Sequence, residues 1–275
     1  MSNQFNADTI EQIRRILTIF NTSEAEIRPH FFLTGGSGTG KTHAIETLCE
    51  ELEITMFDVN AAQLTKEGTS GNSLSKALTP LKGNDGRPVV CFVDEFDKLF
   101  VSGNTNSELA HEVTNGVQNE FLKVLESRTA SVYGDYGHYL DVQVSNVLFI
   151  FAGAFNGEED LDLDRLREFG IKTEFLGRVG LTFPMKQLTL EQLGDILNRH
   201  PLLHKYLALF PDVKHDDVWL EVMAAIEENY VNNTLGARLI TTLLHQYFIH
   251  GGLPKPEVKK TSFQKTLSLK EEKAA

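Results

Sequence analysis

The chain has 275 residues, 41% of them hydrophobic and 23% charged, which is the composition of a globular protein and excludes a disordered, collagen-like or coiled-coil chain. Its formal net charge of −12 disfavours non-specific binding to a nucleic-acid backbone. The two cysteines lie far apart, no apolar run approaches the roughly 18–20 residues of a membrane span, and no signal peptide opens the chain, so we expect a cytoplasmic protein without disulfides, a cysteine zinc site or a membrane partner.

The predicted elements alternate along the first two thirds of the chain. An amphipathic stretch at residues 10–20 predicts a helix that packs on its own domain. Short apolar runs at residues 31–34, 55–60, 89–93 and 147–152 predict strands, with segments of helical periodicity between them. Strands that alternate with helices indicate an α/β fold with a parallel sheet.

The strand-like runs end near Pro184. Residues 188–197, 216–227 and 235–248 show the apolar spacing of helices, and Gly, Pro and Lys dominate from Gly251 onward. We therefore expect three parts: a large α/β domain in residues 1–185, a small all-helical domain in residues 186–250 and a flexible, lysine-rich tail in residues 251–275.

The strongest motif follows the first predicted strand and matches G-x-x-x-x-G-K-[ST]. Glycines let backbone N–H groups curl around phosphates, the following helix adds positive potential, Lys41 reaches the terminal phosphates and the Thr42 hydroxyl suits Mg²⁺. The alternative is a glycine-rich turn that happens to end in Lys-Thr. The motif predicts ATP binding with Mg²⁺, and the nucleotide-binding candidates are Gly35, Gly36, Ser37, Gly38, Thr39, Gly40, Lys41, Thr42 and His43.

A second motif stands at the end of the third predicted strand, where Asp94 and Glu95 follow a β-branched run. In an open α/β sheet, ligands bind at the carboxyl ends of the strands. Asp94 is suited to hold Mg²⁺ together with Thr42, and Glu95 is suited to orient the attacking water, because phosphoryl transfer depends on positioning and charge stabilisation. A helix cap would explain the same pair in isolation.

Five segments in order resemble the AAA+ ATPases, and within them the ClpX/HslU branch of protein unfoldases. The first segment, Asp-Glu-Phe-Asp-Lys, is similar to the Walker B segment of that branch. The glycine-rich loop at residues 35–42 is similar to its Walker A segment. The segments are residues 94–98, residues 115–126, residues 148–155, residues 174–178 and residues 236–238. The resemblance implies a P-loop NTPase αβα sandwich with a five-stranded parallel sheet, a helical lid, and ATP in the groove between them.

The resemblance also implies three further site residues. Arg178 is similar to the arginine finger that acts on a neighbouring subunit, with a surface pair to Glu174 as the alternative. Arg238 is similar to the sensor-2 arginine, with an ordinary arginine at a helix start as the alternative. Asn156 is the first polar side chain available for the sensor-1 role, and a turn residue is the alternative.

The chain departs from the family in the parts that handle substrate. Thr69-Ser70 stands where the unfoldases carry the aromatic-hydrophobic pair of the pore loop, and a hydroxyl pair has little apolar area for gripping a polypeptide. The loop Tyr133–Tyr139 is aromatic where the family has a basic loop. Its tyrosines would grip a polypeptide or stack on nucleic-acid bases, or they would pack on each other across a hairpin. The family's zinc domain and peptidase-docking tripeptide are absent from this sequence, so we expect no ClpP-type peptidase partner.

These features together predict a Mg²⁺-dependent ATPase, active as a ring that is a homohexamer by resemblance. We expect it to act as a chaperone that remodels or unfolds a protein or protein assembly, with a protein substrate or adaptor as its partner. The alternatives are a nucleic-acid-associated motor or loader, in which the lysine-rich tail offsets the acidic bulk charge, and a nucleotide-gated scaffold with slow turnover.

Overall fold

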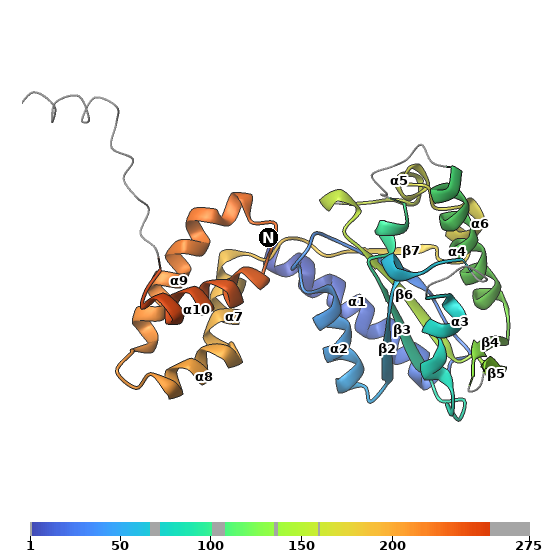
Figure 1. The fold of residues 1–275 in the computed structure, drawn as a ribbon, viewed down its shortest axis with the longest axis horizontal. Coiled ribbons are helices and arrows are strands. Elements are labelled where there is room, and N and C mark those ends of the chain that lie inside the picture. Colours follow the sequence, from blue (N-terminus) through green and yellow to red (C-terminus); the bar gives the residue numbers. More distant parts are fainter. Residues whose placement is uncertain (1, 67–71, 101–107, 135–136, 159, 254–275) are drawn as a thin grey trace, which may run out of the picture.

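The computed structural model describes residues 2–66, 72–100, 108–134, 137–158 and 160–253, and it consists of an α/β domain and a separate group of helices (Figure 1). Two of the segments discussed above, Thr69-Ser70 and residues 254–275, lie outside the described residues. In the part of the chain that the structure describes, no helix has the length and apolar character to cross a bilayer.

The α/β domain is built on a five-stranded sheet in the order β2-β3-β6-β1-β7, in which all neighbouring strands are parallel. The strands are β1 (Phe31–Thr34), β2 (Thr55–Asn60), β3 (Val89–Asp94), β6 (Val147–Gly153) and β7 (Leu181–Pro184). Every residue of β1 and β6 is buried, because both faces of a central parallel strand are covered. The expected parallel sheet of a P-loop NTPase sandwich is thereby confirmed.

Helices cover both faces of this sheet. On one face α1 (Ser2–Thr22) and α2 (Lys41–Glu51) bury Ile13, Leu17 and Ile45 against the strands, so the N-terminal helix packs on its own domain as expected. On the other face a cluster of phenylalanines, with Phe96 at its centre, packs beneath four helices. These helices are α3 (Leu74–Ala77), α4 (Glu108–Glu126), α5 (Leu163–Glu168) and α6 (Thr173–Leu176).

The edge strand β7 was not located from the sequence, because its residues Leu-Thr-Phe-Pro form no continuous apolar run. An antiparallel hairpin of β4 (Thr129–Tyr133) and β5 (Tyr139–Gln143) pairs Tyr133 with Tyr139 beside the main sheet. A hairpin at these tyrosines was one of the alternatives for the aromatic loop.

Four helices form the second group around an apolar core of their own that includes Leu197, Val222 and Leu244. They are α7 (Leu190–Arg199), α8 (Pro201–Leu209), α9 (His215–Asn229) and α10 (Arg238–His250). Three of them match predicted helices. Helix α8 was not predicted, since its nearly continuous apolar residues show no clear period, and it begins with Pro201 after a cap from the His200 side chain.

Candidate functional site

The loop between β1 and α2 carries the glycine-rich motif, and two of its glycines are required by close backbone contacts. Gly35 has a φ of 144°, and a Cβ atom there would collide with the carbonyl of Met185. Gly38 has a φ of 72°, and a Cβ atom there would collide with the backbone of Leu235 and Gly236 in the helical group. The loop therefore leads into the N-terminus of α2 while touching both the end of the sheet and the helical group.

Lys41 is the first residue of α2, and its amine folds back on the loop. Nζ donates hydrogen bonds to the carbonyls of Gly35 at 2.5 Å and Gly36 at 2.9 Å. Burial is the largest influence on the pKa of Lys41 and holds it below the ordinary value, Asp94 and Asp97 raise it in part, and Arg238 lowers it. A bound phosphate would favour the charged amine, so the site is built to gain from an anionic ligand.

The two adjacent carboxylates lie at the end of β3, as expected. Oδ1 of Asp94 accepts a hydrogen bond from the backbone N–H of Glu95 at 2.8 Å, which holds that carboxylate in place. Glu95 itself has a φ of 55°, a left-handed conformation that is uncommon for a residue with a side chain. Backbone strain of this kind occurs at functional sites, where the surrounding structure enforces it.

Asp97 is a buried acid that the sequence analysis left without a role, although it belongs to the Asp94–Lys98 segment. Its side chain is almost fully buried and forms an ion pair with Lys98 at 3.6 Å. Oδ2 accepts the backbone N–H of Phe155 at 3.2 Å, which fixes the turn that follows β6. No pattern in the sequence pairs these two segments, because 58 positions separate Asp97 from Phe155.

A cavity of about 410 Å³ brings most of the predicted site residues together. The carboxylates of Asp94 and Glu95, the Lys41 amine and the Arg238 guanidinium contribute charges of both signs. The predicted residues that line it are Ser37, Gly38, Gly40, Lys41, Thr42, His43, Asp94, Glu95 and Arg238. The cavity thus combines phosphate-binding groups with carboxylates at the carboxyl end of the sheet.

The donors in this cavity fit Mg²⁺. The Thr42 hydroxyl and the Asp94 carboxylate both line it and are both half-buried. Hard oxygen donors of this kind suit Mg²⁺, which proteins hold through one or two carboxylates together with the phosphates of the substrate. Thr42 and Asp94 are therefore the residues that would hold the ion.

Arg238 reaches the loop from the helical group, where it is the first residue of α10. Its Nη1 donates to Oγ of Ser37 at 3.1 Å, and the N–H of Ala237 donates to the Gly38 carbonyl at 3.2 Å. Arg238 is thus a residue at a helix start, as in the alternative, and also a donor to the loop across 201 positions of sequence. The helical group thus supplies a cation to the phosphate-binding loop.

Asn156 lies in an adjoining hollow of about 350 Å³ and not among the residues that line the first cavity. Gly35, Gly36 and Thr39 line the same hollow, together with Met185 at the end of β7. The φ of Asn156 is 59°, which is typical of a turn residue. The structure therefore brings Asn156 beside the phosphate-binding loop, in a hollow that shares Ser37, Gly38, Lys98 and Ala154 with the cavity of Glu95.

Arg178 lines neither hollow. It follows α6 on the surface, where its side chain is about two-fifths exposed. It forms an ion pair with the carboxylate of Glu126 at the end of α4, and Nη1 donates to the backbone carbonyl of Glu174 at 2.9 Å. The carboxylate that pairs with Arg178 is that of Glu126, and Glu174 contributes its main-chain carbonyl.

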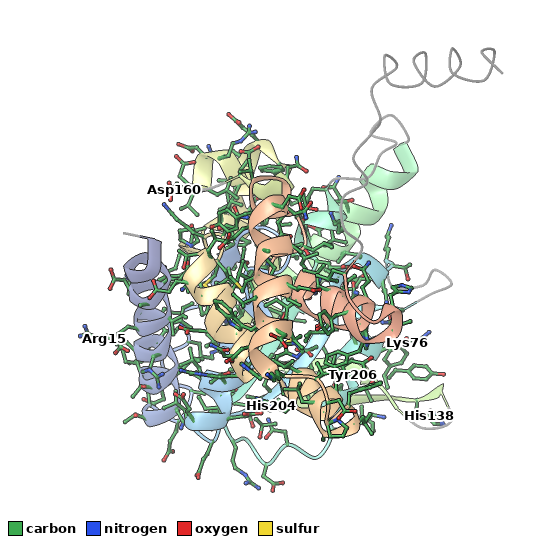
Figure 2. All side chains as sticks on the ribbon, turned by 90° about the vertical axis from the view of Figure 1, so that its left-hand side faces the viewer. Arg15, Lys76, His138, Asp160, His204 and Tyr206 are labelled. Carbon is green, nitrogen blue, oxygen red and sulfur yellow. The ribbon has the colours of Figure 1, made fainter. Side chains whose placement is uncertain are left out.

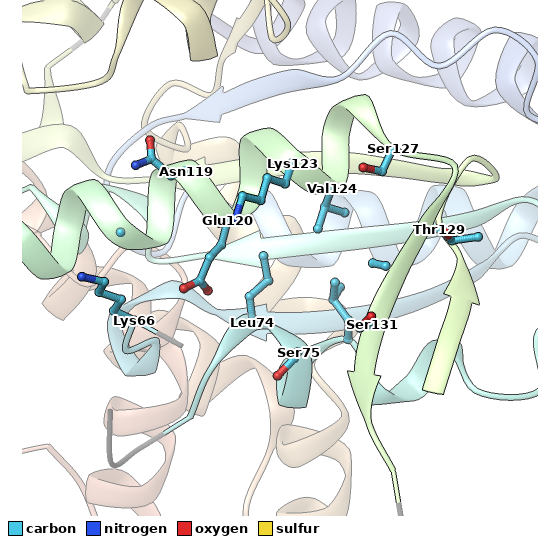
Figure 3. Close-up of a pocket in the computed structure, with 13 residues that line it drawn as sticks. Lys66, Leu74, Ser75, Asn119, Glu120, Lys123, Val124, Ser127, Thr129 and Ser131 are labelled. Atoms are coloured by element: carbon cyan, nitrogen blue, oxygen red, sulfur yellow. The ribbon is translucent and has the colours of Figure 1, made fainter. Parts of the chain in front are cut away.

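Another hollow, of about 540 Å³, lies between α3, α4 and β4 (Figure 3). Lys66, which belongs to the segment of residues 64–71 that stands in the place of the pore loop, lines this hollow. Lys66 packs closely on α4, because a Cβ atom at Gly116 would lie 2.9 Å from its Cγ. This glycine belongs to the motif at residues 115–126, and its contact explains the need for a residue without a side chain.

The aromatic hairpin lies near α3, on the side of the molecule where Figure 2 labels Lys76 and His138. The rings of Tyr133 and Tyr139 pack edge to face with centroids 6.0 Å apart, and the amine of Lys76 lies 5.5 Å from the centre of the Tyr133 ring. These two tyrosines therefore show the cross-strand packing that was one alternative, and Tyr136 lies outside the described residues.

The profile of the ATPase family associated with various cellular activities (AAA) matches residues 31–175, more than half of the chain. The ATP-dependent Clp protease ATP-binding subunit ClpX of Treponema denticola is 24% identical over 312 aligned residues, covering 90% of this chain and 74% of the relative. The protein of the same name from Bacteroides fragilis is 25% identical over 304 residues, covering 92% and 72%.

Proposed function

Because the chain belongs to the AAA family of ATPases and is an ATP hydrolase of ClpX-like sequence, we propose that it works as a ring of subunits that remodels a protein or a protein assembly. The observation that carries the catalytic part is the cavity of about 410 Å³, where Lys41, Thr42, Asp94, Glu95 and Arg238 meet. This cavity offers groups for binding a triphosphate and a carboxylate for orienting water.

The proposed chemistry uses the residues in the places where they lie. The N–H groups at the start of α2 bind phosphate oxygens, and Lys41 exchanges its two loop carbonyls for the terminal phosphates. Thr42 and Asp94 would hold Mg²⁺, which would offset the negative charge of the phosphates. Glu95 orients the attacking water, and Arg238 neutralises charge from the side of the helical group.

Arg178 is proposed to act on the neighbouring subunit. Its surface position, outside the cavity, allows it to exchange the Glu126 carboxylate for the site of another copy, and a guanidinium suits the charge of a transferring phosphoryl group. A contact between two different faces of the same subunit generates a ring when it closes, and we propose six subunits by resemblance. The domain division at residues 185 and 250 is proposed on the same basis.

A protein substrate is proposed from the similarity to the ClpX proteins. The motion would come from rotation of the helical group against the α/β domain during the ATP cycle. Tyr133 and Tyr139 remain 40% and 53% exposed and are available for contact with an extended chain, although they also pack on each other. No ClpP-type peptidase belongs to this proposal.

The test is steady-state ATP hydrolysis by the purified chain, alone and with an unfolded polypeptide or single-stranded DNA. Glu95→Gln is the inactive reference, and Glu50→Gln makes the same change at an exposed position of α2. We expect stimulation by the polypeptide and none by DNA. Stimulation by DNA alone would replace the protein substrate with nucleic acid, and turnover no faster than that of Glu95→Gln in every condition would reject the motor.

A further inference from the structure

We infer that Asn6 is a positioning residue: its carboxamide fixes the link between the two domains and thereby sets Arg238 over the phosphate-binding loop. The inference rests on the proposed function, because it concerns the same site. It assigns to the N-terminal helix a task beyond packing on the sheet.

The carboxamide of Asn6 forms two hydrogen bonds with a single backbone residue. Nδ2 donates to the carbonyl of Lys186 at 3.0 Å, and Oδ1 accepts the N–H of Lys186 at 2.9 Å. A carboxamide presents a donor and an acceptor side by side, as a peptide group does. The Asn6 carboxamide therefore bonds to Lys186 as the backbone of a neighbouring strand would, just after the chain leaves the edge strand β7. Asn6 is only 3% exposed.

Two further bonds hold the same segment to the α/β domain. Oγ1 of Thr9, one turn further along α1, donates to the carbonyl of Pro184 at 3.3 Å. From the opposite side, the N–H of Met185 donates to the carbonyl of Thr34 at the end of β1 at 2.7 Å. The chain is thus attached to the α/β domain up to and including Lys186.

The next two residues are attached to the helical group instead. Nε2 of Gln187 donates to the carbonyl of Tyr230 at 3.3 Å, and the Tyr230 hydroxyl donates to the carbonyl of Leu188 at 2.9 Å. The change of attachment falls between Lys186 and Gln187. A rotation of one domain against the other is therefore concentrated in the backbone bonds at this junction.

The junction is coupled to the nucleotide site at two places. Met185, just before the junction, packs against Gly35 so closely that a Cβ atom on the glycine would collide with its carbonyl. The helical group beyond the junction carries Ala237 and Arg238, which bond to Gly38 and Ser37 of the same loop. A displaced pivot would move Arg238 relative to the loop, so the bonds of Asn6 contribute to nucleotide binding without touching the nucleotide.

The experiment compares Asn6→Ala with Asn21→Ala. Asn21 is a matched control on the same helix, because its Nδ2 donates to the carbonyl of Leu52 within the α/β domain at 3.1 Å. Asn6→Ala is expected to raise the KM for ATP about 3- to 10-fold, the effect of losing one or two buried hydrogen bonds, and Asn21→Ala less than about 2-fold. Thr9→Val removes only the bond to Pro184 and provides a milder variant if Asn6→Ala does not fold.

A second arm repeats Asn6→Ala in a chain that already carries Arg238→Ala. If Asn6 acts through the placement of Arg238, the KM changes by less than about 2-fold in that background, since coupled residues are non-additive. An equal rise in both backgrounds, or a lower melting temperature with an unchanged KM, would overturn the inference. The first result would show that Asn6 affects ATP binding by a route other than Arg238, and the second that Asn6 contributes to stability alone.

A third arm does not depend on hydrolysis. Trp219, the single tryptophan of the chain, lies in α9, and a dye on Glu50→Cys in α2 accepts its excitation energy. Asn6→Ala should broaden the distribution of Trp219–dye distances, whereas Asn21→Ala should leave it unchanged. If the distance distribution broadens but the chain has no ATPase activity, the proposed function is rejected and the role of Asn6 at the Lys186–Gln187 junction is kept. If the distribution is unchanged in a chain that hydrolyses ATP, the role of Asn6 at this junction is rejected.

Discussion

At the scale of single residues, the buried titratable groups connect packing with measurable pH dependence. His30 precedes β1 and is 7% exposed, and its Nδ1 accepts the backbone N–H of Phe149 in β6 at 3.0 Å. Burial, with a contribution from the charge of Arg28, lowers the pKa of His30 to about 3. The imidazole is therefore neutral in the folded chain at pH values where the unfolded chain binds a proton.

We expect the free energy of unfolding to fall as the pH decreases from about 6.5 toward 3, by at most about 1.4 kcal/mol per pH unit from this group. Between pH 7 and pH 5 the loss is about 2 kcal/mol, measured by urea unfolding without nucleotide. His30→Asn keeps an acceptor for the Phe149 N–H without titrating in this range, so its unfolding should depend less on pH. The same slope in His30→Asn as in the parent would contradict this assignment.

Asp97 supports the active-site turn through the N–H of Phe155. Asp97→Ala leaves that buried donor without its partner and should destabilise the chain by about 1–3 kcal/mol. It should also lower kcat for ATP, because the turn after β6 borders the cavity. Asp85→Ala, at a side chain that is 79% exposed, is the control and should change the free energy of unfolding by less than about 0.5 kcal/mol. A stable Asp97→Ala chain with unchanged kcat would remove this positioning role.

At the scale of elements, the contact between the phosphate-binding loop and the start of α10 is made by glycines. Gly236 has a φ of 56°, and a Cβ atom there would collide with the backbone of Gly38. The approach of Arg238 to the loop depends on this contact, because Gly236 lies two residues before it. The contact of the helical group with the phosphate-binding loop therefore requires a residue without a side chain at position 236.

Gly236→Ala should weaken ATP binding about 10-fold, since the added methyl group separates the two backbones and withdraws Arg238. Gly251→Ala is the matched control: Gly251 has a φ of 73°, and no described atom lies within 4 Å of the position of its Cβ. Both variants carry the strain of a left-handed alanine, about 1 kcal/mol, so their melting temperatures should fall alike. Equal ATP affinities, measured by calorimetric titration, would show that the contact does not contribute to binding.

At the scale of the whole molecule, the position of Arg178 distinguishes a ring from an independent subunit. The Arg178 guanidinium lies on the surface beside Glu126, whereas Arg238 lies in the cavity of its own chain. The cavity of one subunit thus contains Arg238 in cis, and Arg178 is the cation that we propose acts on a neighbour. A catalytic site shared between copies would make hydrolysis a property of the assembly.

Subunit mixing tests this arrangement. Glu95→Gln and Arg178→Ala chains should each hydrolyse ATP at least about 10³-fold more slowly than the parent. A 1:1 mixture should recover activity, because about one quarter of head-to-tail contacts then join an intact Glu95 to an intact Arg178 of the neighbour. Measurement of ATP turnover against mixing ratio checks this. Full activity of Arg178→Ala alone would show that Arg178 is a surface residue only.

The sequence by itself determined the features that are local along the chain. The glycine loop of residues 35–42 lies between a strand and a helix, and Asp94 and Glu95 lie at a strand end, because loop conformation and strand burial depend on neighbouring residues. Resemblance then supplied the parallel five-stranded sheet, which the structure confirms.

Only the tertiary structure decided which distant groups meet. Asn6 and Lys186 are 180 positions apart, and Ser37 and Arg238 are 201 apart. The structure also placed Asn156 in the hollow beside Gly35 and Gly36, and located β7 by its pairing with β1. Periodicity shows that a residue is buried or exposed but carries no information about its partner across the fold, so contacts of this kind come only from the packing of the whole chain.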